Sequence, residues 1–400
     1  MYAKFIYLLW SAAFLSHASP EKLTIYFDSD RTSHYESARS IEMGVKTAFD
    51  EVDNKLNNIP IQFIELDHRG NVVRSKRNMG IYGKDPSAVA LFAGLHSPPL
   101  IKYREYINQE NLLILNPWAA GAPITRYPSP DNFIFRLSVD DKKVGSKLVD
   151  YALNDGCTKL DLLLESTPWG QSNSLNMSNA IEQHAEVESE THWFNWGIND
   201  ANARIIASDL EKTKSQCILF VGNSIEGSKL IDALSQLESP PKVYSHWGIT
   251  GGSFPKIVSL DAQKKVALRF IQSCFNFYSS PPSSTSLNVF ERAQRLFPDD
   301  ITSAHIAAPA GFVHGYDLAL LFINAAKNVE LTDDAQTNRV LLKEALENMQ
   351  KPVNGLLKKY SSPYSQFSES NQDAHEALNK DDLCMAQYAS SGAIKILPNE

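Results

Sequence analysis

The sequence predicts an α/β protein with two lobes, each built on a doubly wound parallel sheet. One pattern, a short apolar strand, a small polar loop and then a helix, occurs in two successive runs. The predicted helices between strands span about 10–18 residues, as in βαβ units. The chain of 400 residues also exceeds the usual size of one hydrophobic core. Because ligands of such sheets bind beyond the strand carboxyl ends, we expect a binding cleft between the lobes.

Each predicted element follows from its local pattern. Apolar runs predict the strands of the first lobe at Leu23–Phe27, Ile59–Leu66, Val89–Ala93 and Leu112–Asn116. The same pattern predicts strands of the second lobe at Leu160–Leu164, Thr191–Phe194, Cys217–Val221 and Lys242–Ser245. Later strands are expected within Val266–Phe277 and Leu383–Tyr388. Helical periodicity predicts helices at Glu36–Asp53, Lys142–Leu153, Ser174–His184, Ala201–Glu211, Glu226–Leu237, Gly311–Asn328 and Asn338–Met349.

The chain is expected to cross between the lobes three times. The predicted crossings are Phe133–Asp140, Val266–Phe277 and a segment near Pro352–Leu357. Lobe 1 would then comprise residues 20–134 and 275–352, and lobe 2 residues 139–268 and 353–400. Several strands joining two lobes make a hinge that can close around a ligand.

The N-terminus has the pattern of a secretory signal peptide. Lys4 precedes an apolar run at Phe5–Phe14, and Ser16-His17-Ala18 resembles a cleavage site, so residues 1–18 are predicted to be removed. The alternative, a membrane anchor, would need a longer apolar run. An exported chain with four cysteines predicts disulfides. We favour the pairs Cys157–Cys217 and Cys274–Cys384, with four free thiols as the alternative.

Charge and motifs exclude several functions. The net charge of −8 and the lack of a basic run argue against a nucleic acid partner. No glycine lies between Ser19 and Gly44, where a dinucleotide site would need glycines. The sequence contains no phosphate-binding loop, zinc-protease motif or nucleophile elbow. Its histidines occur singly, at positions such as His68, His96, His246, His305 and His314. We therefore expect no catalysis, no cofactor and no metal.

Five short motifs occur in a characteristic order. They are Asp67-His68-Arg69-Gly70, Ala93-Gly94-Leu95-His96-Ser97, Asn116-Pro117-Trp118-Ala119-Ala120, Pro168-Trp169-Gly170 and Gly315-Tyr316-Asp317-Leu318. No single motif is specific, but their order and spacing resemble the type I periplasmic solute-binding proteins of branched-chain amino acid transporters. The resemblance runs from about Leu23 to Leu397.

The resemblance implies a venus-flytrap fold, a periplasmic location, delivery of a small solute to a membrane permease, and no catalysis. It also implies that the loop with His96 and Ser97 caps a ligand carboxylate, together with the loop that holds Trp118, Ala119 and Ala120. Two departures concern the ligand. Trp247 stands where the family has an acidic residue for the ligand's ammonium group, and Ala120 stands near the family's carboxylate-binding threonine. We therefore expect a ligand other than a standard branched-chain amino acid.

Aromatic residues dominate the predicted strand-end loops. Trp118 belongs to lobe 1, Trp169 and Trp247 belong to lobe 2, and Tyr35 follows the first strand. Such rings bind flat molecules by stacking or organic cations by cation–π contacts; the alternative is that they pack over the sheet edge. Asp28 is a candidate counter-charge for a cation. Candidate hydrogen-bonding residues of this cleft are Ser97, Asn223, Ser224 and Thr250.

Three classes of function remain open on these residues. The first is a ligand-binding protein that feeds a membrane transporter. The second is a sensory subunit of the same fold that reports to a membrane signalling protein. The third is a secreted enzyme, which would turn its ligand over.

Overall fold

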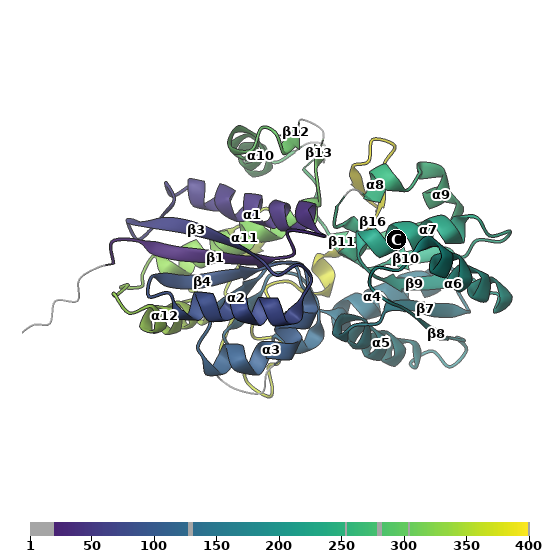
Figure 1. Cartoon of the computed structure of the whole chain (residues 1–400), viewed down its shortest axis with the longest axis horizontal. Helices are drawn as coiled ribbons and strands as arrows, with labels where there is room; N and C mark the ends of the chain where they lie inside the picture. Colours follow the sequence, from purple (N-terminus) through teal and green to yellow (C-terminus); the bar gives the residue numbers. More distant parts are fainter. Residues whose placement is uncertain (1–19, 127–130, 253, 278–281, 303–304, 399–400) are drawn as a thin grey trace, which may run out of the picture.

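A computed structural model describes residues 20–126, 131–252, 254–277, 282–302 and 305–398. These residues form two lobes that lie side by side, each with a central sheet covered by helices (Figure 1). The predicted signal peptide, residues 1–18, lies outside the described residues. Within the described part of the chain, no helix has the length and apolar character needed to cross a membrane.

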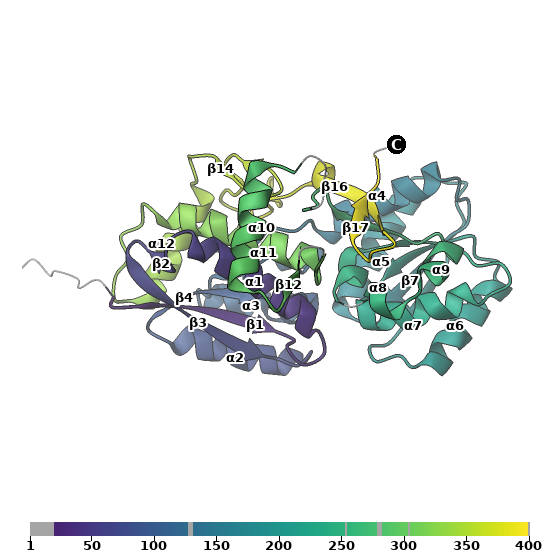
Figure 2. The same cartoon turned by 90° about the horizontal axis from the view of Figure 1, so that it is seen from above.

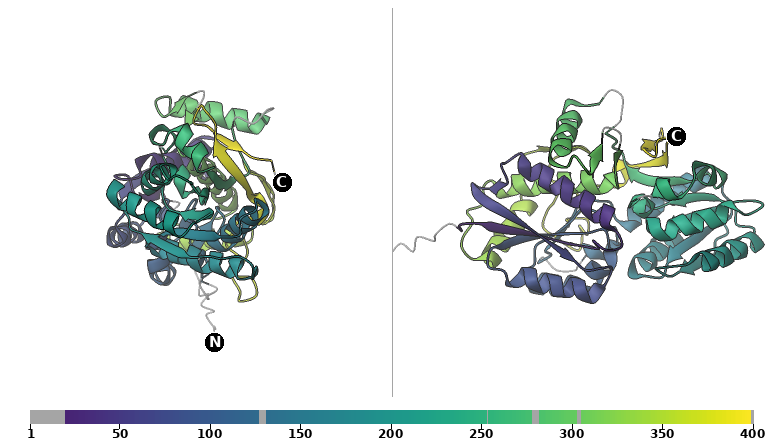
Figure 3. Two further views of the ribbon diagram at one scale, coloured as in Figure 1. Left: turned by 90° about the vertical axis from the view of Figure 1, so that its right-hand side faces the viewer. Right: turned by 45° about the horizontal axis from the view of Figure 1, so that its top comes forward.

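Lobe 1 is built on a six-stranded sheet of order β2-β3-β1-β4-β5-β6. Its strands are β1 (Leu23–Ser29), β2 (Lys55–Leu56), β3 (Ile59–Asp67), β4 (Ala88–Ala93), β5 (Ile114–Asn116) and β6 (Ile134–Arg136). The helices of this lobe are α1 (Tyr35–Asp50), α2 (Val72–Lys84), α3 (Ser97–Gln109), α10 (Ser284–Leu296), α11 (Pro309–Ala326) and α12 (Ala335–Glu347). Helices α1 and α11 cover one face of the sheet, and α2 and α3 cover the other (Figure 1). Helix α10 lies across the outside of α1 (Figure 3).

The close crossing of α1 and α11 explains one of the sequence motifs. A Cβ at Gly44 would lie 2.0 Å from the carbonyl oxygen of Phe312, and one at Gly315 would lie 2.5 Å from that of Ile41. Only glycine fits at both positions. The neighbouring Asp317 is fully buried and accepts hydrogen bonds from the backbone N–H groups of Leu356 and Leu357. The Gly-Tyr-Asp motif is therefore structural in this chain.

Lobe 2 is built on a seven-stranded sheet of order β17-β16-β11-β10-β9-β7-β8. Its strands are β7 (Leu160–Glu165), β8 (Thr191–Phe194), β9 (Cys217–Val221), β10 (Lys242–Ser245), β11 (Arg269–Ser273), β16 (Leu383–Tyr388) and β17 (Ile394–Ile396). Its helices are α4 (Asp141–Asn154), α5 (Pro168–Ile181), α6 (Asp200–Lys212), α7 (Ser224–Ser235), α8 (Phe254–Ile257) and α9 (Leu260–Lys265). Strands β7 to β11 pair in parallel, and β16 and β17 add an antiparallel edge.

The predicted fold class is confirmed: both sheets are dominated by parallel strands and doubly wound. One helix begins earlier than expected. The sequence pattern predicted Ser174–His184, whereas α5 starts at Pro168, because the Thr167 hydroxyl accepts a hydrogen bond from the N–H of Gly170 and Pro168 occupies the first turn. Two short hairpins were not predicted, β12 (Ile301–Thr302) with β13 (His305–Ile306) and β14 (Val353–Asn354) with β15 (Lys359–Tyr360).

Both predicted disulfides are confirmed. Cys157 bonds to Cys217 where β7 and β9 lie side by side, and Cys274, just after β11, bonds to Cys384 in β16. Each bridge therefore joins neighbouring strands of the lobe 2 sheet.

Residues beyond β14 bear on where the third crossing lies. The Tyr360 hydroxyl donates to Asp317, and His375 contacts Glu347, so this stretch stays against lobe 1. Figure 2 shows the β14 segment over lobe 1, whereas β16 and β17 belong to lobe 2. From these contacts we propose that the third crossing lies at residues 378–382 rather than near Pro352–Leu357.

Candidate functional site

The carboxyl ends of the two sheets face each other across the space between the lobes, and the lobes touch there. The N–H of Ala122 donates to the Ser172 hydroxyl at 3.2 Å. The rings of His96 and Trp196 lie 5.0 Å apart, although His96 follows β4 and Trp196 follows β8. A Cβ at Gly252 would come within 2.9 Å of the Glu36 carboxylate. The structure is thus a closed arrangement.

The three predicted tryptophans meet in one buried group between the lobes, which we call the aromatic cluster. Its members are Trp118, Trp169, Trp247, His246 and His314. His314 of lobe 1 lies 6.4 Å from the ring of Trp118 and 6.3 Å from that of Trp247. His246 lies 4.9 Å from Trp169 and 4.4 Å from Trp247. The two histidines therefore link tryptophans from both lobes, a link that the sequence pattern did not predict.

Asp141, at the start of α4, is the acidic member of this region. It is fully buried, and its Oδ1 accepts a hydrogen bond of 3.0 Å from Trp169 Nε1 and lies 3.3 Å from His246 Nε2. Its Oδ2 has no hydrogen-bond partner among the described residues. Burial lowers the pKa of His246 and lowers that of His314 to about 4, so both imidazoles are neutral at neutral pH. Asp141 was missed in the sequence because only the fold brings it to the tryptophans.

A largely apolar pocket adjoins the aromatic cluster at His314 and Thr250. In this closed arrangement its cavity volume is about 40 Å³, measured as the space open to the centre of a water molecule. Its walls include Phe275 and Phe277, which follow β11, Ile306 of β13 and Tyr388 of β16. One of its buried polar atoms, Gln272 Oε1, lacks a hydrogen-bond partner within the described ranges. Apolar walls with a few polar atoms are typical of sites for small organic molecules.

The predicted hydrogen-bonding residues hold the loops of the cleft in place. Ser97 Oγ accepts from the N–H of Gly121 at 3.1 Å, and the carbonyl oxygen of Ala120 accepts from the N–H of Asp141 at 2.9 Å. The Ser224 hydroxyl donates to the Gly251 carbonyl at 2.9 Å, and the Thr250 hydroxyl to the Trp247 carbonyl at 2.7 Å. Asn223 donates to Glu165 at 3.3 Å, and Ala119 accepts from Asn116 and Arg136 through its carbonyl oxygen.

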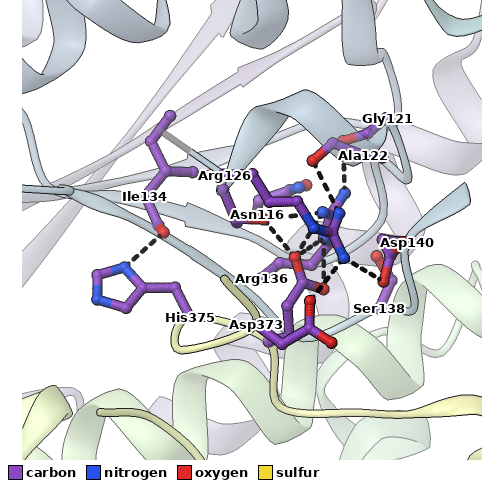
Figure 4. A network of polar contacts seen from close by, with 12 residues as sticks. Asn116, Gly121, Ala122, Arg126, Ile134, Arg136, Ser138, Asp140, Asp373 and His375 are labelled. Atoms are coloured by element: carbon purple, nitrogen blue, oxygen red, sulfur yellow. Dashed lines mark hydrogen bonds and ion pairs between the residues drawn. The ribbon is translucent and has the colours of Figure 1, made fainter. Parts of the chain in front are cut away.

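A buried arginine fixes the loop that carries Trp118. The guanidinium group of Arg136, at the end of β6, donates to the carbonyl oxygens of Ala119 and Gly121 and to the carboxylate of Glu376. Beside it, Arg126 bridges Asp140 and Asp373 (Figure 4). These ion pairs hold the C-terminal segment, through Asp373 and Glu376, against the loop that carries Trp118.

Tyr35 and Asp28 lie apart from the aromatic cluster. Tyr35 begins α1 and is 50% exposed. Asp28 is buried and accepts hydrogen bonds from Ser75 and Asn78 of α2, within lobe 1. This geometry does not support the expected role of Asp28 as a counter-charge for a bound cation. Burial raises the pKa of Asp28 to about 7, even though both hydrogen bonds lower it.

We expect Asp28→Asn to flatten the pH dependence of stability. The pKa of Asp28 rises from 3.8 to about 7 on folding, so the folded state binds a proton more tightly than the unfolded state. This contribution to stability is present below about pH 4 and is lost as the pH rises through about 7. Three pKa units correspond to about 4 kcal/mol, which is the upper limit of the effect. Urea unfolding from pH 4.5 to 8.5 measures it.

The control for this experiment is Asp261→Asn, which replaces an exposed aspartate. Its free energy of unfolding should depend on pH as that of the wild type does. If the free energy of unfolding of Asp28→Asn depended on pH as that of the wild type does, the raised pKa of Asp28 would be contradicted. Glu165 and Asp317, whose pKa values burial raises to about 8 and about 6, account for the slope expected to remain.

A second group of polar residues lies at the rim of the cleft, and we call it the histidine cluster. It consists of His34, His68 and His96, gathered near Asp30. The ring of His96 lies 4.8 Å from that of His34 and 5.6 Å from that of His68. The sequence pattern missed the cluster because its members are far apart in the chain. One sequence feature could have indicated the cluster: His68 and His96 each follow a predicted strand.

Two facing parallel-sheet lobes, closed over a buried aromatic and polar region, define a two-lobed solute-binding protein. The sequence profile described as "Periplasmic binding protein" matches residues 27–377. The chain therefore belongs to the periplasmic binding protein family. No curated protein sequence matches the chain significantly.

Solved structures share the fold at low sequence identity. A type 1 periplasmic binding protein from Bordetella pertussis Tohama I has a TM-score of 0.74 at 14% identity, covering 94% of this chain and 100% of that chain. The leucine-binding protein LivK from Thermotoga maritima has a TM-score of 0.72 at 12% identity, with coverages of 94% and 98%. A solute-binding protein of an ABC transporter from Rhodopseudomonas palustris BisB5, in complex with 3,4-dihydroxybenzoic acid, has a TM-score of 0.72 at 13% identity, with coverages of 94% and 96%.

Proposed function

We propose that this protein binds a small organic solute between its lobes in the periplasm and delivers it, unchanged, to the permease of an ABC-type transporter. Membership of the periplasmic binding protein family supports the binding role. Structural relatives described as solute-binding proteins of ABC transporters support the delivery role. The observation that carries the proposal is the aromatic cluster, which both lobes build and which closure completes.

We propose further that the ligand is an organic cation or a flat aromatic molecule. The aromatic cluster contains three tryptophans, and beside them lies the buried Asp141 Oδ2, which has no hydrogen-bond partner among the described residues. A buried carboxyl oxygen without a partner is costly, and a bound cation would compensate it. A desolvated cation–π contact contributes about 2 kcal/mol. The adjoining pocket supplies apolar walls for the rest of such a molecule.

A standard branched-chain amino acid suits this site poorly. Trp247 and Ala120 stand where the family resemblance leads one to expect an acidic residue and a threonine. The backbone groups near Ala120 are engaged too: its carbonyl oxygen accepts from Asp141, and the N–H of Gly121 donates to Ser97. The ammonium and carboxylate of an amino acid would therefore lose the partners that the family supplies.

Ligand binding is expected to favour the closed arrangement. Both lobes contribute rings to the aromatic cluster, so an open form would separate Trp118 and His314 from Trp169, Trp247 and His246. A ligand shifts the equilibrium only by its difference in affinity for the two forms. A molecule that contacts rings of both lobes has such a difference.

A thermal-shift and calorimetric screen tests the ligand class. The panel holds quaternary amines, polyamines, aromatic acids and branched-chain amino acids, applied to refolded protein of residues 19–400. A ligand at 100 times its dissociation constant stabilises the protein by about 2.7 kcal/mol. We expect Trp247→Ala to weaken binding at least tenfold, through loss of a contact of about 2 kcal/mol.

The matched control is Trp193→Ala, which removes a ring that is 42% exposed and should leave binding unchanged. Stabilisation by leucine or valine alone would contradict the proposed ligand class. A deletion strain tests delivery: we expect it to lose uptake of the identified solute. Unchanged uptake with a lost cellular response to the solute would instead identify a sensory subunit.

A further inference from the structure

Three neighbouring strands of lobe 1 are each followed by a residue whose side chain can bind a metal ion. His68 follows β3, Asp30 follows β1 and His96 follows β4, and these strands are adjacent in the sheet. His34 occupies the N-cap position of α1, and its side chain makes no capping hydrogen bond. Because the carboxyl ends of parallel strands meet at one edge, the fold brings these residues together although the chain separates them.

Asp30, His34 and His96 have the geometry of a metal site. Asp30 Oδ2 lies 3.0 Å from His34 Nδ1 and 3.3 Å from His96 Nε2, and each of the three residues offers a ligand atom within 4.8 Å of those of the other two. In a tetrahedral zinc site with bonds of about 2.0–2.1 Å, ligand atoms are about 3.3 Å apart. We propose that these three residues bind a divalent transition metal of the zinc class, at the rim of the solute cleft and distinct from the aromatic cluster.

The loop after β1 orients Asp30 for this role. Its Oδ1 accepts hydrogen bonds from the backbone N–H of Ser33 at 2.9 Å and of Thr32 at 3.3 Å. Oδ2 is left to face the two imidazoles. Asp30 and His96 are buried and His34 is nearly so, so little side-chain motion separates the observed arrangement from a coordinating one.

Two nitrogens of the histidine cluster that lack hydrogen-bond partners in the described ranges also support a metal site. His34 Nε2 and His68 Nδ1 are buried and, within the part of the chain that the structure describes, have no hydrogen-bond partner. When a metal takes the lone pair of His34 Nδ1, the ring proton moves to Nε2, which is free to carry it. Two imidazole nitrogens and one carboxylate oxygen form a donor set suited to zinc, with a fourth position left for water.

Lobe 2 closes over this site. The ring of Trp196 packs against His96 at 5.0 Å. Glu226 of α7 is close enough to His96 to interact with it electrostatically, and one of its buried oxygens, Oε2, lacks a partner in the described ranges. A bound cation would thus face a carboxylate from the opposite lobe, and metal binding should favour the closed form.

Zinc binding to the untagged protein, without any solute, tests the proposal. Equilibrium dialysis followed by elemental analysis should find one zinc ion per chain, and cobalt substitution should give the absorption bands of a tetrahedral site. We expect His34→Ala and His96→Ala each to weaken zinc binding at least tenfold. His184→Ala, which removes a histidine of lobe 2 outside the cluster, should bind as the wild type does.

Circular dichroism and thermal unfolding without metal check that each variant is folded. A wild-type protein that retains no zinc, or variants His34→Ala and His96→Ala that retain it fully, would overturn the proposal. Trp247→Ala should keep its zinc while losing solute binding, so the metal site and the proposed solute site can fail independently.

Discussion

Glu376→Ala is expected to reduce the free energy of unfolding by about 3–5 kcal/mol, the range for removing one partner of a buried ion pair. The side chains of Arg136 and Glu376 are 0% and 1% exposed. Arg136 Nε donates to Glu376 Oε2 at 2.9 Å, and its Nη2 donates to Oε1 at 2.6 Å. Without Glu376 the guanidinium charge stays buried with only neutral acceptors in direct contact. Urea unfolding, followed by tryptophan fluorescence, measures the loss.

Glu369→Ala is the matched control, because it removes the same charge from an exposed position of the same C-terminal segment. It should change stability by less than about 0.5 kcal/mol. An equally small loss in Glu376→Ala would mean that the ion pair does not hold the segment. Since Arg136 also holds the carbonyl oxygens of Ala119 and Gly121, we expect Glu376→Ala to weaken solute binding as well.

Replacing Cys274 and Cys384 together by alanine is expected to lower the free energy of unfolding by about 4 to 5 kcal/mol. The bridge closes a loop with a sequence separation of 110 residues, which the entropic treatment of loop closure values at about 4.8 kcal/mol. The loop contains α10, α11 and α12, all of lobe 1, so the bridge keeps β16 on the lobe 2 sheet after the chain returns. Unfolding in guanidinium chloride measures the change.

The second bridge provides the comparison. Cys157 and Cys217 are separated by 60 residues, for which the same treatment predicts about 4.3 kcal/mol. We expect the two double variants to lose similar stability, with the Cys274 pair losing slightly more. A loss below about 1 kcal/mol for the Cys274 and Cys384 pair would show that the paired strands alone hold the lobe together.

Asp28, within β1, and Asp30, just after it, have different partners that the sequence pattern does not predict. Asp28 and Asp30 are two residues apart at the end of the first predicted strand, and the sequence makes Asp28 the candidate counter-charge for the ligand. In the structure Asp28 is held by Ser75 and Asn78 of α2, whereas Asp30 reaches His34 and His96. Nothing in the strand pattern states which helix will lie over a given residue or where the strand will end.

The tryptophans illustrate the opposite case. Trp118, Trp169 and Trp247 follow predicted strands, and parallel strands place their following loops at one sheet edge, so their common location could be expected from the sequence. The sequence pattern did not predict that Asp141, His246 and His314 lie among these tryptophans. Asp141 begins α4, His246 directly follows β10 and His314 lies in the first half of α11, and only the packing of two lobes joins them.

The sequence by itself determined the two parallel sheets, because these follow from periodicity along the chain, and it favoured the cysteine pairs that the structure confirms. The tertiary structure alone decided the partners of Asp28, the joining of the tryptophans through His246 and His314, and the assembly of Asp30, His34 and His96. Each of those depends on contacts between residues far apart in the chain, and such contacts are set by the packing of helices and lobes rather than by local pattern.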